Sequence, residues 1–195
     1  MRTFENRAAD KGYLMIAGID EAGRGPLAGP VVSAAVILPD DYTDPLIDDS
    51  KRLTPGKRAF LYDRLYKEAV TVGIGIVDAV EIDRINILQA TRLAMAMAVK
   101  NLSPQPDYLL IDGNVGISLT VEQEPVVRGD SLSISIAAAS IIAKVTRDRM
   151  MEQYNLDYPE YGFAGHKGYP TKAHRAAVLK YGFTPIHRAS FTVKA

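Results

Sequence analysis

The feature that most constrains the fold is a glycine- and proline-rich segment, residues 21–30, which separates two short apolar runs. Its three glycines and two prolines favour turns over any regular element, so this segment must be a loop or a set of turns. The flanking runs, residues 14–20 and 31–38, are short and apolar and end at polar or proline residues, which is typical of buried strands. The domain therefore begins with a strand, a long turn and a second strand.

The rest of the chain alternates between strand-like and helix-like segments. Such an order predicts a mixed α/β sheet with helices on its faces. In the helix expected over residues 81–100, the core face includes Ile82, Ile85, Leu88, Met95 and Val99. We expect further strands at residues 72–77 and 108–112 and within 119–127, and further helices at residues 55–69, 131–154 and 171–180.

Composition excludes several classes of protein. A length of 195 residues suits one domain with a sizeable core, so residues 1–195 are interpreted as a single domain. The absence of cysteine excludes disulfides, thiolate zinc sites and a cysteine nucleophile, and the three histidines make a histidine-rich zinc site unexpected. Without a signal-peptide pattern or a membrane-spanning apolar run, we expect a soluble, cytoplasmic protein with no membrane association.

The charge is unevenly distributed, although the formal net charge is zero. Residues 131–195 carry nine Lys or Arg against four Asp or Glu, whereas residues 1–130 carry fourteen against nineteen. A basic part beside an acidic part is compatible with a phosphate-binding face next to a metal-binding face. Chance asymmetry explains the same counts, because charge blocks are weak evidence.

Acidic residues stand where the predicted strands end. Asp20 and Glu21 follow the first strand, Asp112 closes the strand at 108–112, and Asp130 precedes a long helix. Active sites of α/β proteins gather at strand ends, and carboxylates are the ligands that Mg²⁺ and Mn²⁺ prefer. Converging carboxylates repel one another unless cations or protons neutralise them, so a cluster of them predicts a metal site.

Each acid also has a simpler interpretation. Asp20 and Glu21 fit a solvated turn, Asp112 followed by Gly113 is a common turn signal, and Asp130 fits a helix N-cap. Asp48 and Asp49 lie in a polar loop, and turn chemistry explains them. Asp148, four residues after Lys144, fits an ordinary surface ion pair on a helix. The sequence alone therefore leaves convergence of the four acids open.

Other candidate residues are a glycine pair, an aromatic loop and a helix face. Gly23 and Gly25 flank Arg24, which suits close backbone approach to a ligand beside a phosphate-binding side chain, or simply a tight turn. The loop at residues 161–169 combines aromatic rings with glycines and a lysine, as in a nucleic-acid contact or a structured surface loop. Lys144 and Arg147 fit either contacts to a nucleic-acid backbone or a solvated helix face.

Taken together, these segments closely resemble ribonuclease HII of bacteria, in the type 2 ribonuclease H family. The resemblance runs from about residue 14 to residue 191 in family order, and its first and alanine-rich segments are long and specific. The matching segments are residues 18–32, 49–51, 110–113, 129–130, 136–148, 162–163, 166–169 and 187–191.

The resemblance implies a ribonuclease H-like α/β fold, with a mixed five-stranded sheet flanked by helices and a small C-terminal part of helices and loops, from about residue 156. It implies an endonuclease that cuts the RNA strand of RNA/DNA hybrids, and DNA duplexes at embedded ribonucleotides, leaving 5′-phosphate and 3′-hydroxyl ends. Such an enzyme serves ribonucleotide excision repair and DNA replication. We expect a monomer whose partner is the nucleic-acid duplex.

The resemblance also assigns residues. It implies two Mn²⁺ or Mg²⁺ ions held by Asp20, Glu21, Asp112 and Asp130. Gly23, Arg24 and Gly25 would read the ribose 2′-hydroxyl at the RNA–DNA junction, and Tyr169 would pack on the adjoining deoxyribose. Lys51, Lys144 and Arg147 would supply weaker substrate contacts.

Two other classes of function remain as alternatives. A nucleic-acid-binding module without catalysis would keep the basic C-terminal part but would not need four acids. A phosphotransferase or ATPase on the same fold lacks support, because no segment matches the phosphate-binding pattern G-x-x-x-x-G-K-[ST].

Overall fold

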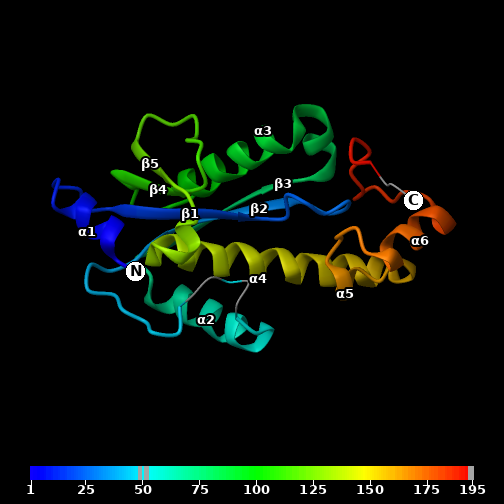
Figure 1. The fold of residues 1–195 in the computed structure, drawn as a ribbon, viewed down its shortest axis with the longest axis horizontal. Helices are drawn as coiled ribbons and strands as arrows, with labels where there is room; N and C mark the ends of the chain where they lie inside the picture. The colour runs from blue at the N-terminus through cyan, green and yellow to red at the C-terminus, as the bar shows by residue number, and fades with distance from the viewer. Residues whose placement is uncertain (48–49, 51–52, 193–195) are drawn as a thin grey trace.

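The centre of the protein is a mixed five-stranded sheet of order β3-β2-β1-β4-β5 (Figure 1). The computed structural model describes residues 1–47, 50 and 53–192. β1 pairs antiparallel with β2 and parallel with β4, so it joins the two halves of the sheet. The strands are β1 (Ile16–Ala22), β2 (Val31–Ile37), β3 (Thr71–Val77), β4 (Tyr108–Asp112) and β5 (Glu122–Val126). The expected mixed α/β sheet is confirmed.

Helices cover both faces of the sheet, and a small C-terminal part extends beyond its end (Figure 1). α3 packs against β3 and β2, α4 packs against β1 and β2, and α2 packs on α4. α5 and α6 form the C-terminal part. The helices are α1 (Thr3–Ala9), α2 (Pro55–Glu68), α3 (Ala79–Lys100), α4 (Ile134–Asp157), α5 (Phe163–His166) and α6 (Lys172–Tyr181), with 3₁₀ turns at Gly129–Ser131 and Pro159–Tyr161.

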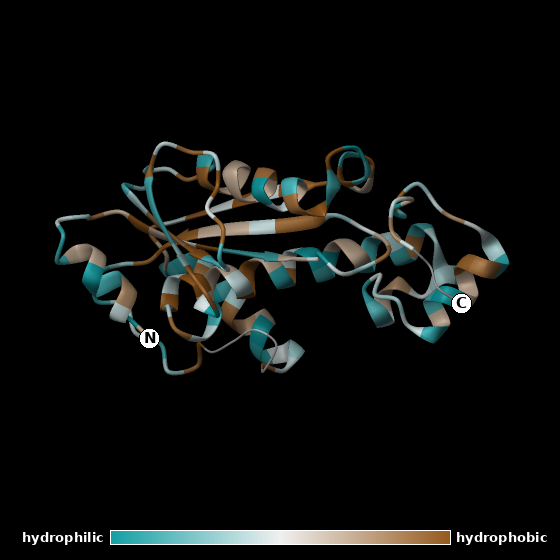
Figure 2. Cartoon of the chain, turned by 45° about the horizontal axis from the view of Figure 1, so that its top comes forward, coloured by the Kyte–Doolittle hydropathy of each residue, from teal (hydrophilic) through white to brown (hydrophobic). Residues whose placement is uncertain are grey.

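The core has one layer on each side of the sheet because successive strand residues point to opposite faces. In β2, Ala34 and Val36 face the layer formed with α4 and α2. Their neighbours Ala35 and Ile37 face the layer formed with α3. Figure 2 shows apolar residues along the sheet between the two layers of helices. Within the described ranges, no helix combines the length and apolar character needed to cross a bilayer.

The predicted core face of α3 is correct at Ile82, Met95 and Val99, which are buried, but wrong at Leu88, which is 43% exposed. The physical reason is a kink at Asn86, whose backbone has φ 68° and ψ 162°. The Asn86 carboxamide accepts hydrogen bonds from the amides of Leu88 and Gln89, as an N-cap does. A new helical turn begins after Asn86, so residues beyond it face different directions from those that a single continuous helix would give.

The sequence analysis left residues 1–13 unassigned, and the structure places α1 there. Glu5 of α1 is 4% exposed. Its carboxylate accepts hydrogen bonds from the hydroxyls of Ser133 and Ser135 at 2.5 and 2.7 Å and from the Ser135 amide at 3.0 Å. A carboxylate at the start of a helix is favoured by the helix dipole. α1 is thereby fixed to the N-terminus of α4.

Gly18 sets the distance between β1 and α4. A β-carbon at this position would lie 2.1 Å from the Ser135 carbonyl carbon, inside the backbone of α4. We predict that Gly18→Ala lowers the free energy of unfolding by about 1–3 kcal/mol, as overpacked cores do. Urea denaturation measures the change, and Gly56→Ala is the control because its β-carbon would meet no atom within 4 Å. Equal stability of the two variants would contradict this close approach.

Candidate active site

Three of the predicted acids meet in one cavity of about 480 Å³ at the end of β1 and β4. Asp20 and Glu21 lie in β1, and Asp112 is the last residue of β4. The parallel register aligns Ile19 with Ile111, so the two strands deliver Asp20 and Asp112 to the same edge. The walls of the cavity also include Gly23, Arg24, Gly25, Lys144 and Tyr169.

Asp20 is a strongly perturbed acid of this cavity. Asp20 is buried, with 5% of its surface exposed. Burial, followed by the negative charges of Glu21 and Asp112, raises the pKa of Asp20 well above its ordinary value. The Asp20 carboxylate accepts a hydrogen bond from the Glu21 amide at 2.7 Å, which opposes that shift. The cavity therefore concentrates negative charge around a buried carboxylate.

Asp130 lies next to this cluster. It is 7% exposed and belongs to the 3₁₀ turn Gly129–Ser131. The neighbouring Gly129 amide donates a 2.7 Å hydrogen bond to Asp112, so this turn holds Asp112 in place. Asp130 is not among the described residues that line the cavity. The N-cap interpretation is wrong, because Ser133 caps α4 by accepting from the Ile136 amide. The helix begins at Ile134, three residues later than the start expected at residue 131.

The donor set of the cavity fits a hard divalent cation. Carboxylate oxygens are the ligands that Mg²⁺ and Mn²⁺ prefer, and a cation would relieve the repulsion that raises the pKa of Asp20. In the part of the chain that the structure describes, no three Asp, Glu or His side chains already stand close enough to enclose an ion.

The glycine-rich turn after β1 forms the wall opposite Tyr169. Gly23 has a φ of 99°, a conformation that L side chains rarely adopt. Arg24 keeps 52% of its side chain exposed, and its guanidinium lies 3.4 Å from the Glu21 carboxylate. A β-carbon on Gly25 would lie 3.7 Å from the Tyr169 ring. Tyr169 is 41% exposed, and its ring and the glycine turn line the same cavity.

Arg147 does not lie on the surface, which corrects both sequence interpretations of this residue. It is fully buried. Its guanidinium donates to the carbonyls of Pro30, Lys167 and Ala28 at 2.9, 3.0 and 3.1 Å. The predicted contact with substrate is wrong because these main-chain carbonyls occupy the guanidinium. Arg147 instead joins the glycine-rich turn to the loop that carries Tyr169.

Arg188 is a second buried arginine, to which the sequence analysis gave no role. It is 1% exposed, and burial together with nearby Arg147 lowers its pKa to about 9. Its guanidinium donates only to carbonyls of the glycine-rich turn. Arg188 lies in the family-matching segment 187–191, but no side-chain pattern indicates its partners, since these are main-chain atoms.

Two buried histidines hold the backbone of Tyr169. The Thr184 amide donates to Nδ1 of His187 at 2.9 Å, which leaves the His187 proton on Nε2. That proton is donated to Nε2 of His174 at 3.0 Å. His174 therefore carries its own proton on Nδ1 and donates it to the Tyr169 carbonyl at 3.0 Å. The arrangement requires both rings to be neutral.

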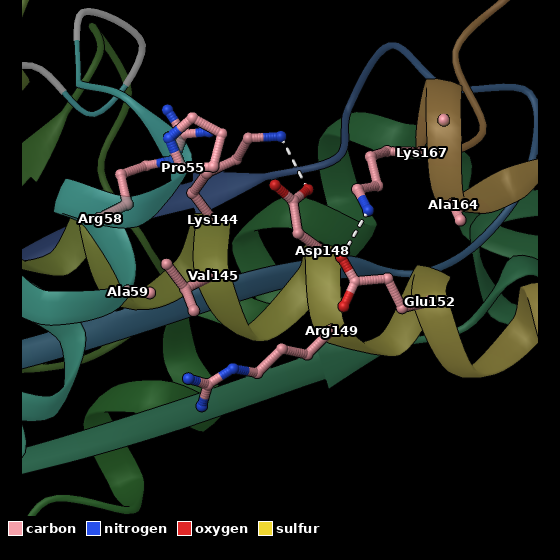
Figure 3. Close-up of a pocket in the computed structure, with 11 residues that line it drawn as sticks. Pro55, Arg58, Ala59, Lys144, Val145, Asp148, Arg149, Glu152, Ala164 and Lys167 are labelled. Atoms are coloured by element: carbon pink, nitrogen blue, oxygen red, sulfur yellow. Dashed lines mark hydrogen bonds and ion pairs between the residues drawn. The ribbon is translucent and has the colours of Figure 1, made fainter.

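Lys144 reaches two cavities. It lines the acidic cavity and also a neighbouring one of about 580 Å³, shown in Figure 3. In that view Lys144 pairs with Asp148 and Lys167 pairs with Glu152, each at 2.7 Å. The expected pairing of Asp148 with Lys144 is confirmed. Lys144 stays a predicted substrate contact, whereas Lys51, Asp48 and Asp49 lie outside the described residues.

Solved structures share this architecture. The crystal structure of ribonuclease H2 from Pyrococcus horikoshii OT3 superposes with a TM-score of 0.77 at 30% identity, covering 92% of this chain and 95% of that one. The ribonuclease HII of Archaeoglobus fulgidus, solved as a complex with PCNA, gives 0.76 at 26% identity, covering 93% and 97%. Bst-RNase HIII in complex with Mn²⁺ shares the fold at 0.69 and 18% identity, covering 92% and 68%. The fold and its acidic cavity define an endonuclease of the ribonuclease H class, whose members depend on metal ions.

Sequence comparison specifies the family. The profile of ribonuclease HII matches residues 17–194. Ribonuclease HII of Syntrophus aciditrophicus is 55% identical over all of this chain and 92% of its own length, and that of Geobacter sulfurreducens is 58% identical over 96% and 87%. The chain belongs to the ribonuclease HII family, as the resemblance of its motifs implied.

The histidine pair predicts a loss of stability in mild acid. Burial and nearby His174 lower the pKa of His187 from its ordinary 6.5 to about 4. The unfolded chain binds the proton near pH 6.5 and the folded chain only near pH 4, so this stabilisation is complete above pH 6.5 and lost as the pH falls toward 4. In urea denaturation, His187→Gln should be less stable than the parent at pH 7.5 and lose less stability between pH 6.5 and 4. Parallel pH profiles would exclude this contribution.

Proposed function

We propose that this ribonuclease HII cleaves the RNA strand of RNA/DNA hybrids, and DNA duplexes at embedded ribonucleotides, by hydrolysis that uses two Mg²⁺ or Mn²⁺ ions. The observation that carries the proposal is the buried Asp20 carboxylate, placed beside Glu21 and Asp112 in a cavity whose other wall is the glycine turn and Tyr169. The acids, the glycine turn and the exposed Tyr169 ring thus share one opening.

Asp20, Glu21, Asp112 and Asp130 would hold the ions. Bound ions of this kind activate water and stabilise the departing 3′-oxygen in an in-line displacement. The chain's own part is to concentrate the acids: β1 supplies Asp20 and Glu21, while the Gly129 amide orients Asp112. Hydrolysis by water leaves a 5′-phosphate and a 3′-hydroxyl and does not consume the 2′-hydroxyl.

The glycine turn and Tyr169 would identify the ribonucleotide. The 2′-hydroxyl is the group that distinguishes ribose from deoxyribose, and it both donates and accepts hydrogen bonds. Backbone atoms of Gly23, Arg24 and Gly25 lie close enough to the cavity to meet it without an intervening side chain. The Tyr169 ring faces Gly25 and would pack on the next deoxyribose.

Weaker contacts would hold the rest of the duplex. Lys144 projects from α4 into the cavity, and Lys51 is proposed from the sequence alone. The C-terminal part, residues 156–195, would supply the face that meets the substrate beyond Tyr169. We propose that the enzyme works as a monomer in the cytoplasm, in ribonucleotide excision repair and DNA replication.

Replacing the central carboxylate tests the metal site. Asp20→Asn keeps the size of the side chain but removes a negative ligand. Cleavage of a labelled DNA duplex with one ribonucleotide should therefore fall at least about a hundredfold, which is more than the loss of a group that only orients a ligand would cause. Because Asp20 is destabilised by burial and by its neighbours, the variant should unfold at no lower urea concentration than the parent at pH 7. Wild-type cleavage with Mg²⁺ or Mn²⁺ would overturn the assignment.

Gly25→Ala tests whether the sugar binds in the cavity beside Gly25 and Tyr169. The added methyl group would make an ordinary 3.7 Å contact with Tyr169, so the substitution should not strain the fold. The methyl group would, however, occupy space where the ribose is proposed to bind. We expect kcat/KM on a single embedded ribonucleotide to fall about tenfold or more, with unchanged urea stability. Gly23→Ala is a poorer test because its β-carbon would strike Arg147 at 2.1 Å. Gly56→Ala, whose β-carbon meets no atom within 4 Å, is the control and should keep the parent kinetics. Unchanged kinetics of Gly25→Ala would show that the sugar does not bind beside Gly25.

A further inference from the structure

Arg188 uses its whole guanidinium on one short turn of the chain. An arginine has five N–H donors in a rigid planar fork. Nε and Nη2 donate to the Gly29 carbonyl at 3.0 and 2.8 Å, and Nη2 also donates to Gly23 at 2.6 Å. Nη1 donates to Arg24 at 3.0 Å and to Pro26 at 2.8 Å. All five donors therefore reach carbonyls of residues 23–29.

The positive charge of Arg188 is buried among main-chain carbonyls and is not paired directly with any of the described carboxylates. A buried charge is costly unless it is paired or fully hydrogen-bonded. Among the residues that the structure describes, no carboxylate forms an ion pair with Arg188. The main-chain carbonyls, with the Phe191 ring 5.0 Å from the guanidinium carbon, replace a counter-ion. The nearby Asp83 carboxylate, which accepts from the Ala189 amide, also favours the charged form of Arg188. The hydrogen bonds of the guanidinium nevertheless require the turn to keep its carbonyls pointed inward.

Carbonyls that point inward fix where the amides point. In a trans peptide the C=O and N–H groups are coplanar and point in opposite directions. Among the described residues, only the Ser103–Pro104 bond is cis, so the peptides after Gly23 and Arg24 are trans. Their carbonyls point at the buried Arg188, and the amides of Arg24 and Gly25 therefore point away from it. Both residues are exposed and line the acidic cavity.

We propose that Arg188 is a positioning residue for ribonucleotide recognition, because it turns the Arg24 and Gly25 amides toward the cavity where the ribose 2′-hydroxyl would bind. The inference rests on the proposed reading of that hydroxyl by the glycine turn. Arg188 does not touch substrate. It sets the donor geometry in advance, so that no loop entropy is lost when the ribonucleotide enters.

Arg188→Lys tests the role, because lysine keeps the charge but offers three donors on a flexible stem. In an Asp20→Asn background with Mg²⁺, we would measure binding to a DNA duplex with one ribonucleotide and to the same duplex without it. We expect the preference for the ribonucleotide to fall about tenfold, the worth of one or two hydrogen bonds, with affinity for the all-DNA duplex unchanged.

Arg147→Lys is the matched control. Arg147 is equally buried, but its donors reach Ala28, Pro30 and Lys167, outside the Gly23–Gly25 tripeptide. Because Arg147 also supports the loop that carries Tyr169, this variant should lose stability and affinity for both duplexes. The ratio of the two affinities should be kept, since Arg147 does not bind the carbonyls of Gly23 or Arg24. An intact preference in Arg188→Lys, or equal loss in both variants, would overturn the proposal and leave Arg188 a general structural residue.

A second measurement decides the matter if Arg188→Lys does not fold. In Asp20→Asn protein with Arg188 intact, the Arg24 and Gly25 amide resonances should shift on adding the ribonucleotide duplex and not the all-DNA duplex. The Gly29 amide, which donates to Ile186 at 2.8 Å, should not respond. Absence of the Arg24 and Gly25 shifts would overturn the proposal. If this protein instead binds both duplexes equally, the proposed reading of the 2′-hydroxyl itself has failed.

Discussion

The parallel pairing of β1 with β4 is the constraint on which the rest of the structure depends. It brings the carboxyl ends of both strands to one edge, and with them Asp20 and Asp112. The pairing holds because β1 is confined on its other sides, by β2 along its second edge and by the backbone of α4, which Gly18 allows to approach. Shifting β1 by one residue would turn Asp20 to the opposite face of the sheet, away from Asp112.

The acidic cavity and the glycine-rich turn are stabilised in opposite ways. Carboxylates crowd the cavity, so the folded chain carries unfavourable repulsion that the raised pKa of Asp20 reveals. Below the glycine-rich turn, two buried guanidiniums are surrounded by carbonyls. Negative charge thus faces the opening, where a cation would bind, while positive charge is kept inside the protein. A net charge of zero conceals this separation.

The C-terminal part is joined to the sheet mainly through the main chain. The Leu27 amide donates to Gly168, the Gly29 amide to Ile186, and the Arg188 amide to Leu27. These bonds and the pair of His174 and His187 join the glycine-rich turn, the loop that carries Tyr169 and the C-terminal residues 186–188 into one wall of the cavity. Backbone groups of an irregular turn must find partners when buried, and here the tail supplies them. The turn and Tyr169 consequently keep a fixed separation across the cavity.

The strands, the mixed sheet and the acids at the strand ends were predictable, because short apolar runs mark buried strands and acids follow two of them. The residues alone left open whether Asp20, Glu21 and Asp112 meet, since that depends on the parallel pairing of β1 with β4. Leu88 was mispredicted since a single left-handed residue, Asn86, restarts the helix. The positions of Arg147 and Arg188 were decided only by the tertiary structure. Their partners are carbonyl oxygens, which every residue carries, so no pattern of side chains can announce which of them a buried arginine will bind.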